Sequence, residues 1–186
     1  MPAGTSRLAV VVVGALLVAG CAGKAADPTA AAPGTSTAST TTPAPTTTTV
    51  PPLTAEEDAW LEAFGKLRER AEKVVIDSPT NLTAAAMGAL ATRMRRCSRE
   101  LARLGAPTAP LQPVYKLAKQ GCAQSDKGAK CFATAAGIGD TITSFAEERK
   151  MTQSVECGIA AGARSVELLG RASVKGFEIS EKAAHG

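Results

Sequence analysis

From Thr54 to the end of the chain, apolar residues recur at alternating steps of three and four, which is the spacing of one face of an α-helix. No segment shows the sustained apolar–polar alternation of a half-buried strand. The pattern therefore predicts one all-α domain over residues 54–186, most simply an antiparallel four-helix bundle with short connections. The four apolar stripes cover residues 60–74, 87–104, 115–136 and 155–177.

Capping residues and prolines indicate where these helices begin. Thr54 and Glu57 form a capping-box pattern, in which each side chain accepts a backbone N–H of the other residue. The same pattern returns at Ser144 and Glu147. The two remaining starts are expected at Ser78, which precedes Pro79, and at about Gln112, between Pro110 and Pro113.

Charged stretches leave the continuity of the last two helices open. Residues 126–128 are capable of splitting the third helix, and residues 148–150 of interrupting the fourth. The fourth stripe includes Gly158 and Gly162, a pair of small residues expected to allow close packing within the bundle. Its apolar face is expected to run through Val155, Ile159, Gly162, Val166, Leu169, Ser173 and Phe177.

The net charge of the domain is modest. The whole chain has 21 basic and 17 acidic residues. Arg7, Lys24 and Asp27 precede the domain, which leaves it a net charge of about +3. Nucleic-acid-binding proteins carry a much stronger basic field, so no nucleic-acid partner is expected.

The composition changes sharply before Thr54. Residues 24–53 are almost entirely Thr, Ala, Pro, Ser and Gly. Such a segment has too few large apolar side chains to offset the entropy cost of becoming ordered. Residues 21–53 are therefore expected to form a disordered linker.

The N-terminus carries a secretion pattern. Arg7 is followed by an apolar stretch, residues 8–18, that is too short to span a bilayer. The stretch leads into Leu17-Val18-Ala19-Gly20-Cys21, which resembles the lipobox of bacterial lipoprotein signal peptides. The resemblance implies that residues 1–20 are a signal peptide removed before Cys21, and that the Cys21 sulfur carries diacylglycerol. An uncleaved N-terminal anchor is the alternative.

The resemblance also implies a location. A lipobox cysteine carries at least two acyl chains, which give stable attachment to a bilayer. The membrane is thus an expected partner through Cys21, and the domain is expected on the extracytoplasmic face of the cell membrane. The lipobox, the Thr/Pro-rich linker and the Ala- and Arg-rich domain together look like lipoproteins of high-GC Gram-positive bacteria.

Four cysteines remain once Cys21 is set aside. An even number in an oxidising, extracytoplasmic setting favours two disulfides. A zinc site is the rival interpretation, but no two cysteines have the Cys-x-x-Cys spacing and the one histidine, His185, lies at the C-terminus. No metal is therefore expected. The four residues are Cys97, Cys122, Cys131 and Cys157.

Helical geometry bears on how these cysteines pair. Cys122 and Cys131 are nine residues apart, which places them on opposite sides of one continuous helix. Folding the second and third helices about Pro107 brings Cys97 within one turn of Cys122. The favoured pairs are Cys97–Cys122 and Cys131–Cys157. If the third helix is broken, Cys122–Cys131 with Cys97–Cys157 is the natural alternative.

The sequence offers no evident catalytic set. With His185 as the one histidine, no internal imidazole can serve as a general base. The carboxylate pairs Glu56-Glu57 and Glu147-Glu148 lie in expected first turns, where interaction with the helix dipole is the plain interpretation. We expect no enzyme activity and no cofactor.

Five arginines between residues 93 and 103 flank the second apolar stripe. Arg96, Arg99 and Arg103 share one helix face, at i, i+3 and i+7. A solvated surface is the plain interpretation. The functional interpretation is contact with an anionic wall polymer, a lipid headgroup or an envelope protein.

These observations favour a non-catalytic binding or interaction module of the cell envelope. A long tether and a disulfide-linked bundle are suited to presenting a surface. The alternative is a carrier or sensor of a small apolar ligand in the bundle interior. Such a ligand would occupy a cavity lined by Met87, Leu90, Met94 and Phe132.

Overall fold

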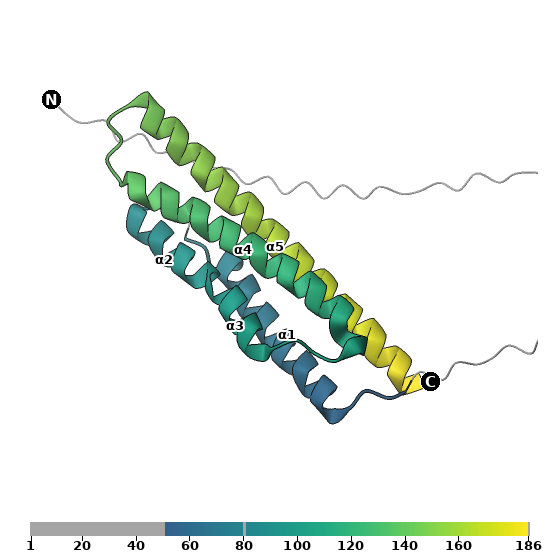
Figure 1. The fold of residues 1–186 in the computed structure, drawn as a ribbon. Helices are drawn as coiled ribbons and strands as arrows, with labels where there is room; N and C mark the ends of the chain where they lie inside the picture. The colour runs from purple at the N-terminus through teal and green to yellow at the C-terminus, as the bar shows by residue number, and fades with distance from the viewer. Residues whose placement is uncertain (1–50, 80, 186) are drawn as a thin grey trace, which may run out of the picture. The chain divides into compact units, whose positions relative to one another are not determined.

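A computed structural model describes residues 51–79 and 81–185, and every regular element within these ranges is a helix (Figure 1). The predicted all-α class is therefore confirmed for the described residues. The expected signal peptide (1–20), the expected lipidated Cys21 and the expected linker up to residue 50 lie outside them. The elements are α1 (Ala55–Ile76), α2 (Ala84–Met94), α3 (Arg96–Leu104), η1 (Ala109–Leu111), α4 (Gln112–Ile138) and α5 (Phe145–His185).

Both predicted capping boxes are present. At α1, the Thr54 N–H donates to Glu57 Oε2 at 2.8 Å, and the Glu57 N–H donates to Thr54 Oγ1 at 3.3 Å. At α5, Ser144 and Glu147 exchange the same two bonds at 3.1 and 3.2 Å. Each box satisfies backbone donors that have no partner within the helix.

The predicted start of the second helix at Ser78 is wrong. The Ser78 hydroxyl instead donates to the Val74 carbonyl at 3.1 Å, at the end of α1. The next helix begins after Thr83, whose hydroxyl accepts the Ala86 N–H at 3.2 Å. The Ala84 N–H donates to Asp140 Oδ1 at 2.6 Å, so a side chain from the α4–α5 connection helps to fix this start.

The second predicted helix is divided at Arg95 into α2 and α3. The buried Ser125 hydroxyl, on α4, donates to the Met94 carbonyl oxygen at 2.9 Å. In a continuous helix this carbonyl would accept the N–H of Ser98. A side chain inserted into the hydrogen-bond ladder is a known cause of helix kinks.

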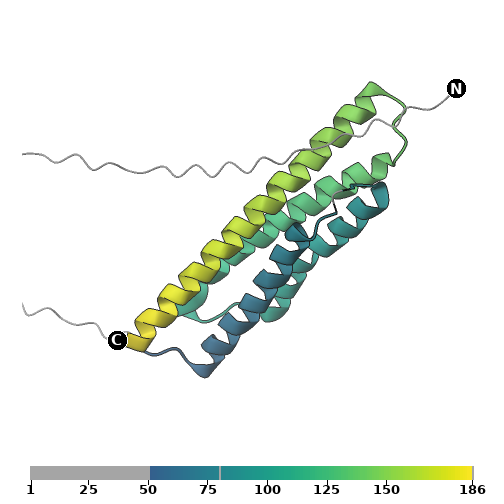
Figure 2. The ribbon, with the colours of Figure 1, turned by 180° about the vertical axis from the view of Figure 1, so that it is seen from behind.

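Neither of the two interruptions left open by the sequence occurs. The α4 helix is continuous through residues 126–128, and α5 is continuous through residues 148–150. The two helices pack side by side, as the opposite views in Figures 1 and 2 both show. Gly121 lies against Leu169, and Gly128 lies against the Gly158 carbonyl, so residue numbers rise along α4 where they fall along α5.

Small residues form much of the buried face of α5, and the expected close packing is confirmed at Gly158. Gly162 is also buried, but a Cβ atom there would make only ordinary contacts, at 3.6 Å. A Cβ atom at Gly158 would lie 2.6 Å from Cε2 of the Phe132 ring, so a larger residue fits here only if the ring moves. The predicted stripe is wrong at two large members, because Ile159 is 50% exposed and Phe177 is 65% exposed. The buried positions are Gly158, Ala161, Gly162, Ser165, Leu168, Leu169, Ala172, Gly176 and Ala183.

Aromatic residues anchor α1 to the other helices. Trp60 stacks on Phe64 with ring centroids 5.6 Å apart, and its indole N–H donates to the Gly105 carbonyl at 3.1 Å. Tyr115 of α4 meets the Trp60 ring edge-on. The α1 helix also contacts α3 and α5. No helix among residues 51–79 and 81–185 is both long and apolar enough to cross a bilayer.

Two disulfides link the helices in the favoured pairing. Cys97 of α3 is bonded to Cys122 of α4, and Cys131 of α4 is bonded to Cys157 of α5. The Cα–Cα separations are 5.2 and 5.9 Å. The continuity of α4 decides this outcome, because it holds Cys122 and Cys131 on different sides of one helix.

Candidate functional site

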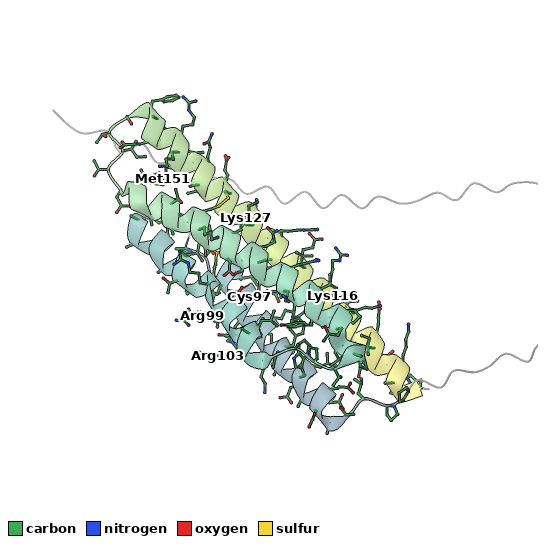
Figure 3. The ribbon with its side chains drawn as sticks, viewed as in Figure 1. Cys97, Arg99, Arg103, Lys116, Lys127 and Met151 are labelled. Atoms are coloured by element: carbon green, nitrogen blue, oxygen red, sulfur yellow. A yellow bond between two sulfur atoms is a disulfide. The ribbon has the colours of Figure 1, made fainter. Side chains whose placement is uncertain are left out.

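The candidate site is the arginine face of α2 and α3. Its members are exposed, except for the half-buried Arg93. Figure 3 places Arg99 and Arg103 at the outer edge of the domain. None of these arginines forms an ion pair with another described residue. The arginine face consists of Arg93, Arg95, Arg96, Arg99 and Arg103.

The local sequence explains why α3 presents this face. The buried residues of α3 are Cys97 and Leu101, which are four residues apart and point toward α4 and α1. Leu104 also packs against this core, whereas the arginines of α3 lie toward solvent. The three arginines expected to share one face do not all line the same hollow: Arg96 lines one beside α1, Arg99 lines another beside α4, and Arg103 lines neither.

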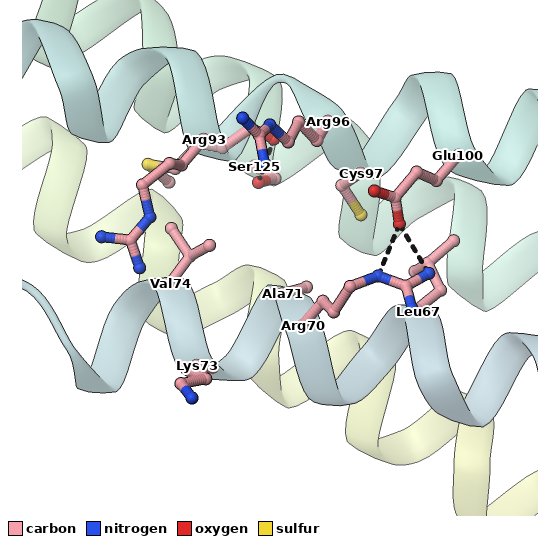
Figure 4. Close-up of a pocket in the computed structure, with 11 residues that line it drawn as sticks. Leu67, Arg70, Ala71, Lys73, Val74, Arg93, Arg96, Cys97, Glu100 and Ser125 are labelled. Atoms are coloured by element: carbon pink, nitrogen blue, oxygen red, sulfur yellow. Dashed lines mark hydrogen bonds and ion pairs between the residues drawn. The ribbon is translucent and has the colours of Figure 1, made fainter.

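The first hollow, which we call the inter-helix groove, lies between α1 and the α2–α3 pair (Figure 4). Its volume is about 180 Å³. Ser125 of α4 lies at its base. It is lined by Leu67, Arg70, Ala71, Lys73, Val74, Arg93, Met94, Arg96, Cys97, Glu100 and Ser125.

One end of the inter-helix groove is closed by an ion pair. Arg70 of α1 donates from Nε and Nη2 to the same Glu100 oxygen, at 3.0 and 2.8 Å. At the other end, Arg93 extends from α2 toward Val74 on α1 (Figure 4). Because Arg70 already engages the carboxylate of Glu100, this acid does little to offset the charges of Arg93 and Arg96.

The second hollow lies on the other side of the arginine face and is more open. It has a volume of about 410 Å³ and is lined by Thr92, Arg95, Ser98, Arg99 and Asp126. The Ser98 hydroxyl donates to Asp126 Oδ2 at 2.5 Å. The Asp126 carboxylate opposes the charges of Arg95 and Arg99, so the inter-helix groove is the stronger of the two at attracting an anion.

Two of the carboxylates that the sequence raised as acid–base candidates, Glu57 and Glu147, cap helix starts instead. Hydrogen bonds from the Thr108 hydroxyl and then from the Thr54 N–H lower the pKa of Glu57 below its usual value. Bonds from the Thr143 hydroxyl and backbone N–H lower the pKa of Glu147 in the same way. A lowered pKa keeps both groups ionised, which suits capping and not proton donation near neutral pH.

The contribution of α1 and α4 to this site could not be predicted from the sequence. Arg70 and Lys73 flank the first apolar stripe as ordinary surface cations, and Ser125 is part of the third stripe. Only the packing of α1 against α3 places Arg70 beside Glu100. A search for opposite charges at the edges of neighbouring stripes would have suggested that one contact, but not the groove.

No cluster of three or more His, Cys, Asp or Glu side chains in the described part of the chain is arranged to hold a metal ion. The described residues at the candidate site form an arginine-rich surface beside one partly apolar groove. No protein-family model matches the chain, and no match was found among curated proteins or solved structures.

Proposed function

We propose that this chain is a lipid-anchored, extracytoplasmic lipoprotein whose helical domain is a non-catalytic binding module of the cell envelope. The domain is an antiparallel four-helix bundle, with α2 and α3 counted as one divided helix. A disordered linker connects it to diacylglycerol on Cys21. The lipobox-like sequence before Cys21 supports the anchor, and the two disulfides suit an oxidising compartment.

The single observation that supports the binding function is the set of arginine side chains on the arginine face that form no ion pair with a described residue. The cations at Arg95, Arg99 and Arg103 are exposed, and no ion pair offsets them among the described residues. Such a surface attracts phosphate- or carboxylate-bearing polymers and headgroups, with about 1 kcal/mol for each cation near an anionic membrane. The partner is thus an anionic component of the envelope.

Packing in the bundle interior does not favour the alternative of an apolar-ligand carrier. The expected cavity residues are each at most 4% exposed and belong to one packed cluster. Both hollows described above lie at the surface between helices. The four residues are Met87, Leu90, Met94 and Phe132.

The anchor is tested by labelling with radioactive palmitate in a bacterial host. The wild-type chain should incorporate label and sediment with membranes. Cys21→Ala should incorporate none and should leave the membrane fraction. Label on the Cys21→Ala chain, or an unblocked N-terminus at Met1 in the wild type, would refute the proposed anchor.

The arginine face is tested by co-sedimentation of the non-acylated full chain with vesicles containing phosphatidylglycerol. Arg99→Gln with Arg103→Gln should weaken binding by roughly tenfold or more, following the energy per cation given above. Lys127→Gln with Lys130→Gln is the matched control, because it removes two exposed charges from α4. Equal loss in both variants would show that net charge alone, and not this face, drives binding.

A further inference from the structure

The inter-helix groove has two kinds of lining at once. Its rim carries the guanidinium groups of Arg93 and Arg96, and neither is ion-paired to another described residue. Lys73 also lines the groove, although in Figure 4 its amine points away from α2 and α3. Each of the two guanidinium groups can donate paired N–H bonds, which suits a carboxylate or a phosphate.

The floor of the groove is apolar. It is formed by side chains from both walls, and Met94 is buried while Val74 is half-buried. A dry apolar cavity of about 150 Å³ holds a molecule of the size of benzene. The groove has a volume of about 180 Å³ but is open and includes the space beside its charged rim, so its floor has room for an apolar group of at most that size. The floor residues are Leu67, Ala71, Val74 and Met94.

We propose that the inter-helix groove binds a small anionic amphiphile, a single-chain or single-ring molecule with one carboxylate or phosphate monoester. The anionic head lies between Arg93 and Arg96, and the apolar part lies on the floor beside Val74. The Arg70–Glu100 ion pair closes the far end and sets the length of the ligand. The proposal rests on the proposed binding function and names a ligand for one side of the arginine face.

The alternatives for this groove fit its lining less well. A purely apolar ligand would leave the two arginines without a partner, and a bare phosphate would leave the floor exposed to water. Cys97, the one sulfur at the groove that could react, is held in the bond to Cys122. Only a molecule with both an anionic group and an apolar group pairs with the arginines of the rim and also covers the apolar floor.

Octyl phosphate, titrated below its micelle concentration into the full non-acylated chain with both disulfides formed, tests the proposal by calorimetry. One saturable site is expected. Octanol, which lacks the head, and inorganic phosphate, which lacks the chain, should each bind at least about tenfold more weakly. Inorganic phosphate binding as tightly as octyl phosphate would overturn the proposal.

Two variants locate the site. Arg93→Gln with Arg96→Gln should weaken octyl phosphate binding by about tenfold or more, and Ala71→Leu should do the same by filling the floor. Arg99→Gln with Arg103→Gln removes as much charge outside the groove and should leave binding unchanged. Circular dichroism verifies that each variant is folded. If Ala71→Leu does not fold, the arginine variants and the two comparison ligands decide the outcome.

The same variants separate this proposal from the proposed function. If the chain binds anionic vesicles but not octyl phosphate, the proposed envelope function is supported and the proposed groove ligand is wrong. A chain that binds octyl phosphate but not vesicles has the groove ligand without a surface partner. If Ala71→Leu, which fills the groove without changing the charge of the arginine face, also weakens vesicle binding, the amphiphile reaches the groove from a bilayer; if it does not, the source is a soluble molecule.

Discussion

Single side chains at the contact between α4 and α5 determine how closely these helices approach. Gly158 lies against the Phe132 ring, which is 4% exposed and has little room to move. Gly170, on the same helix, has no other atom within 4 Å of a Cβ position. The two glycines therefore have different roles, although the sequence gives them the same appearance.

Gly158→Ala should lower the free energy of unfolding by about 1–2 kcal/mol. Overpacking against Phe132 costs about 1–3 kcal/mol and outweighs the gain in helix propensity. Gly170→Ala is the control and should raise stability by about 0.5–1 kcal/mol, because only the propensity term applies. Urea denaturation measures both. A stabilised Gly158→Ala protein would contradict the close packing.

Glu57 should make the stability of α1 depend on pH. Its pKa in the folded state lies below the unfolded value of roughly 4.3. The ionised form is therefore favoured by folding, and its contribution is complete above that value and is lost as the pH falls through the lower folded pKa. The difference in Tm between the wild type and Glu57→Gln should shrink on acidification below pH roughly 4.

Thermal unfolding followed from neutral pH into this acid range measures that difference. Glu56→Gln is the matched control, since Glu56 lies in the same first turn and is exposed. A difference between wild type and Glu57→Gln that stays constant across the range would exclude the carboxylate as its source.

At the scale of elements, the break between α2 and α3 determines how the arginines of the arginine face are oriented. Ser125 engages the Met94 carbonyl, and the chain turns at Arg95 before α3 resumes. Arg93 and Arg96 thus stand on two helices, on either side of the break. Their arrangement at the groove depends on a residue from α4.

Ser125→Ala should leave the buried Met94 carbonyl without its partner and cost about 1–3 kcal/mol of folding free energy. Thr134→Ala is a suitable control, because the exposed Thr134 hydroxyl bonds only to its own helix, at the Lys130 carbonyl. Its effect should stay within about 0.5 kcal/mol. Chemical denaturation compares the two, and equal effects would argue against the inserted hydrogen bond as a structural element.

Some elements could be predicted from the sequence because their causes are local. The capping boxes at Thr54 and Ser144 depend on residues three apart, and the disulfide pairing follows once the third helix is continuous. The Arg95 break could not be predicted, because its cause is Ser125, some thirty residues away. The exposed Ile159 was misplaced because the inward face of α5 is made of small residues that contribute weakly to an apolar stripe.

The candidate site was predictable only in part, for a similar reason. Arg96, Arg99 and Arg103 could be found from their spacing on one helix. The groove beside Arg96 depends on how α1 packs against α3, which no local pattern specifies. The spacing of the charged residues is therefore enough to predict the arginine face. The inter-helix groove can be found only from the tertiary packing.

At the scale of the whole molecule, the two disulfides connect α3, α4 and α5. Their loops span sequence separations of 25 and 26 residues. In the chain-entropy model, each closure contributes about 3 kcal/mol by restricting the unfolded chain. The bridges compensate for a core in which many contacts are made by alanine and glycine.

Replacing Cys97 and Cys122 together by Ala should lower the free energy of unfolding by about 3 kcal/mol. Replacing Cys131 and Cys157 together by Ala should lower it by a similar amount. Guanidinium denaturation under non-reducing conditions measures the loss. Peptide mapping of the wild type should recover the two cross-linked pairs. A Cys122–Cys131 peptide would contradict the pairing described here.

Binding of the whole domain to anionic vesicles should weaken strongly with salt. Contacts between exposed charges are screened as the Debye length falls from about 10 Å at 0.1 M salt to about 3 Å at 1 M. The fraction bound should drop several-fold over that range. Binding that does not respond to salt would indicate an apolar contact in place of the arginine face.

The α1 helix lies outside both disulfide loops and comes first after the proposed tether. Any tension applied through a membrane anchor enters the domain at Thr54 and loads α1 before it reaches a covalent cross-link. The inter-helix groove lies between α1 and the α2–α3 pair. Tension on the tether would therefore separate α1 from this pair and release a ligand bound in the groove. If the proposed anchor is present, force on the linker and occupancy of the groove would then be coupled, because neither disulfide among the described residues holds α1.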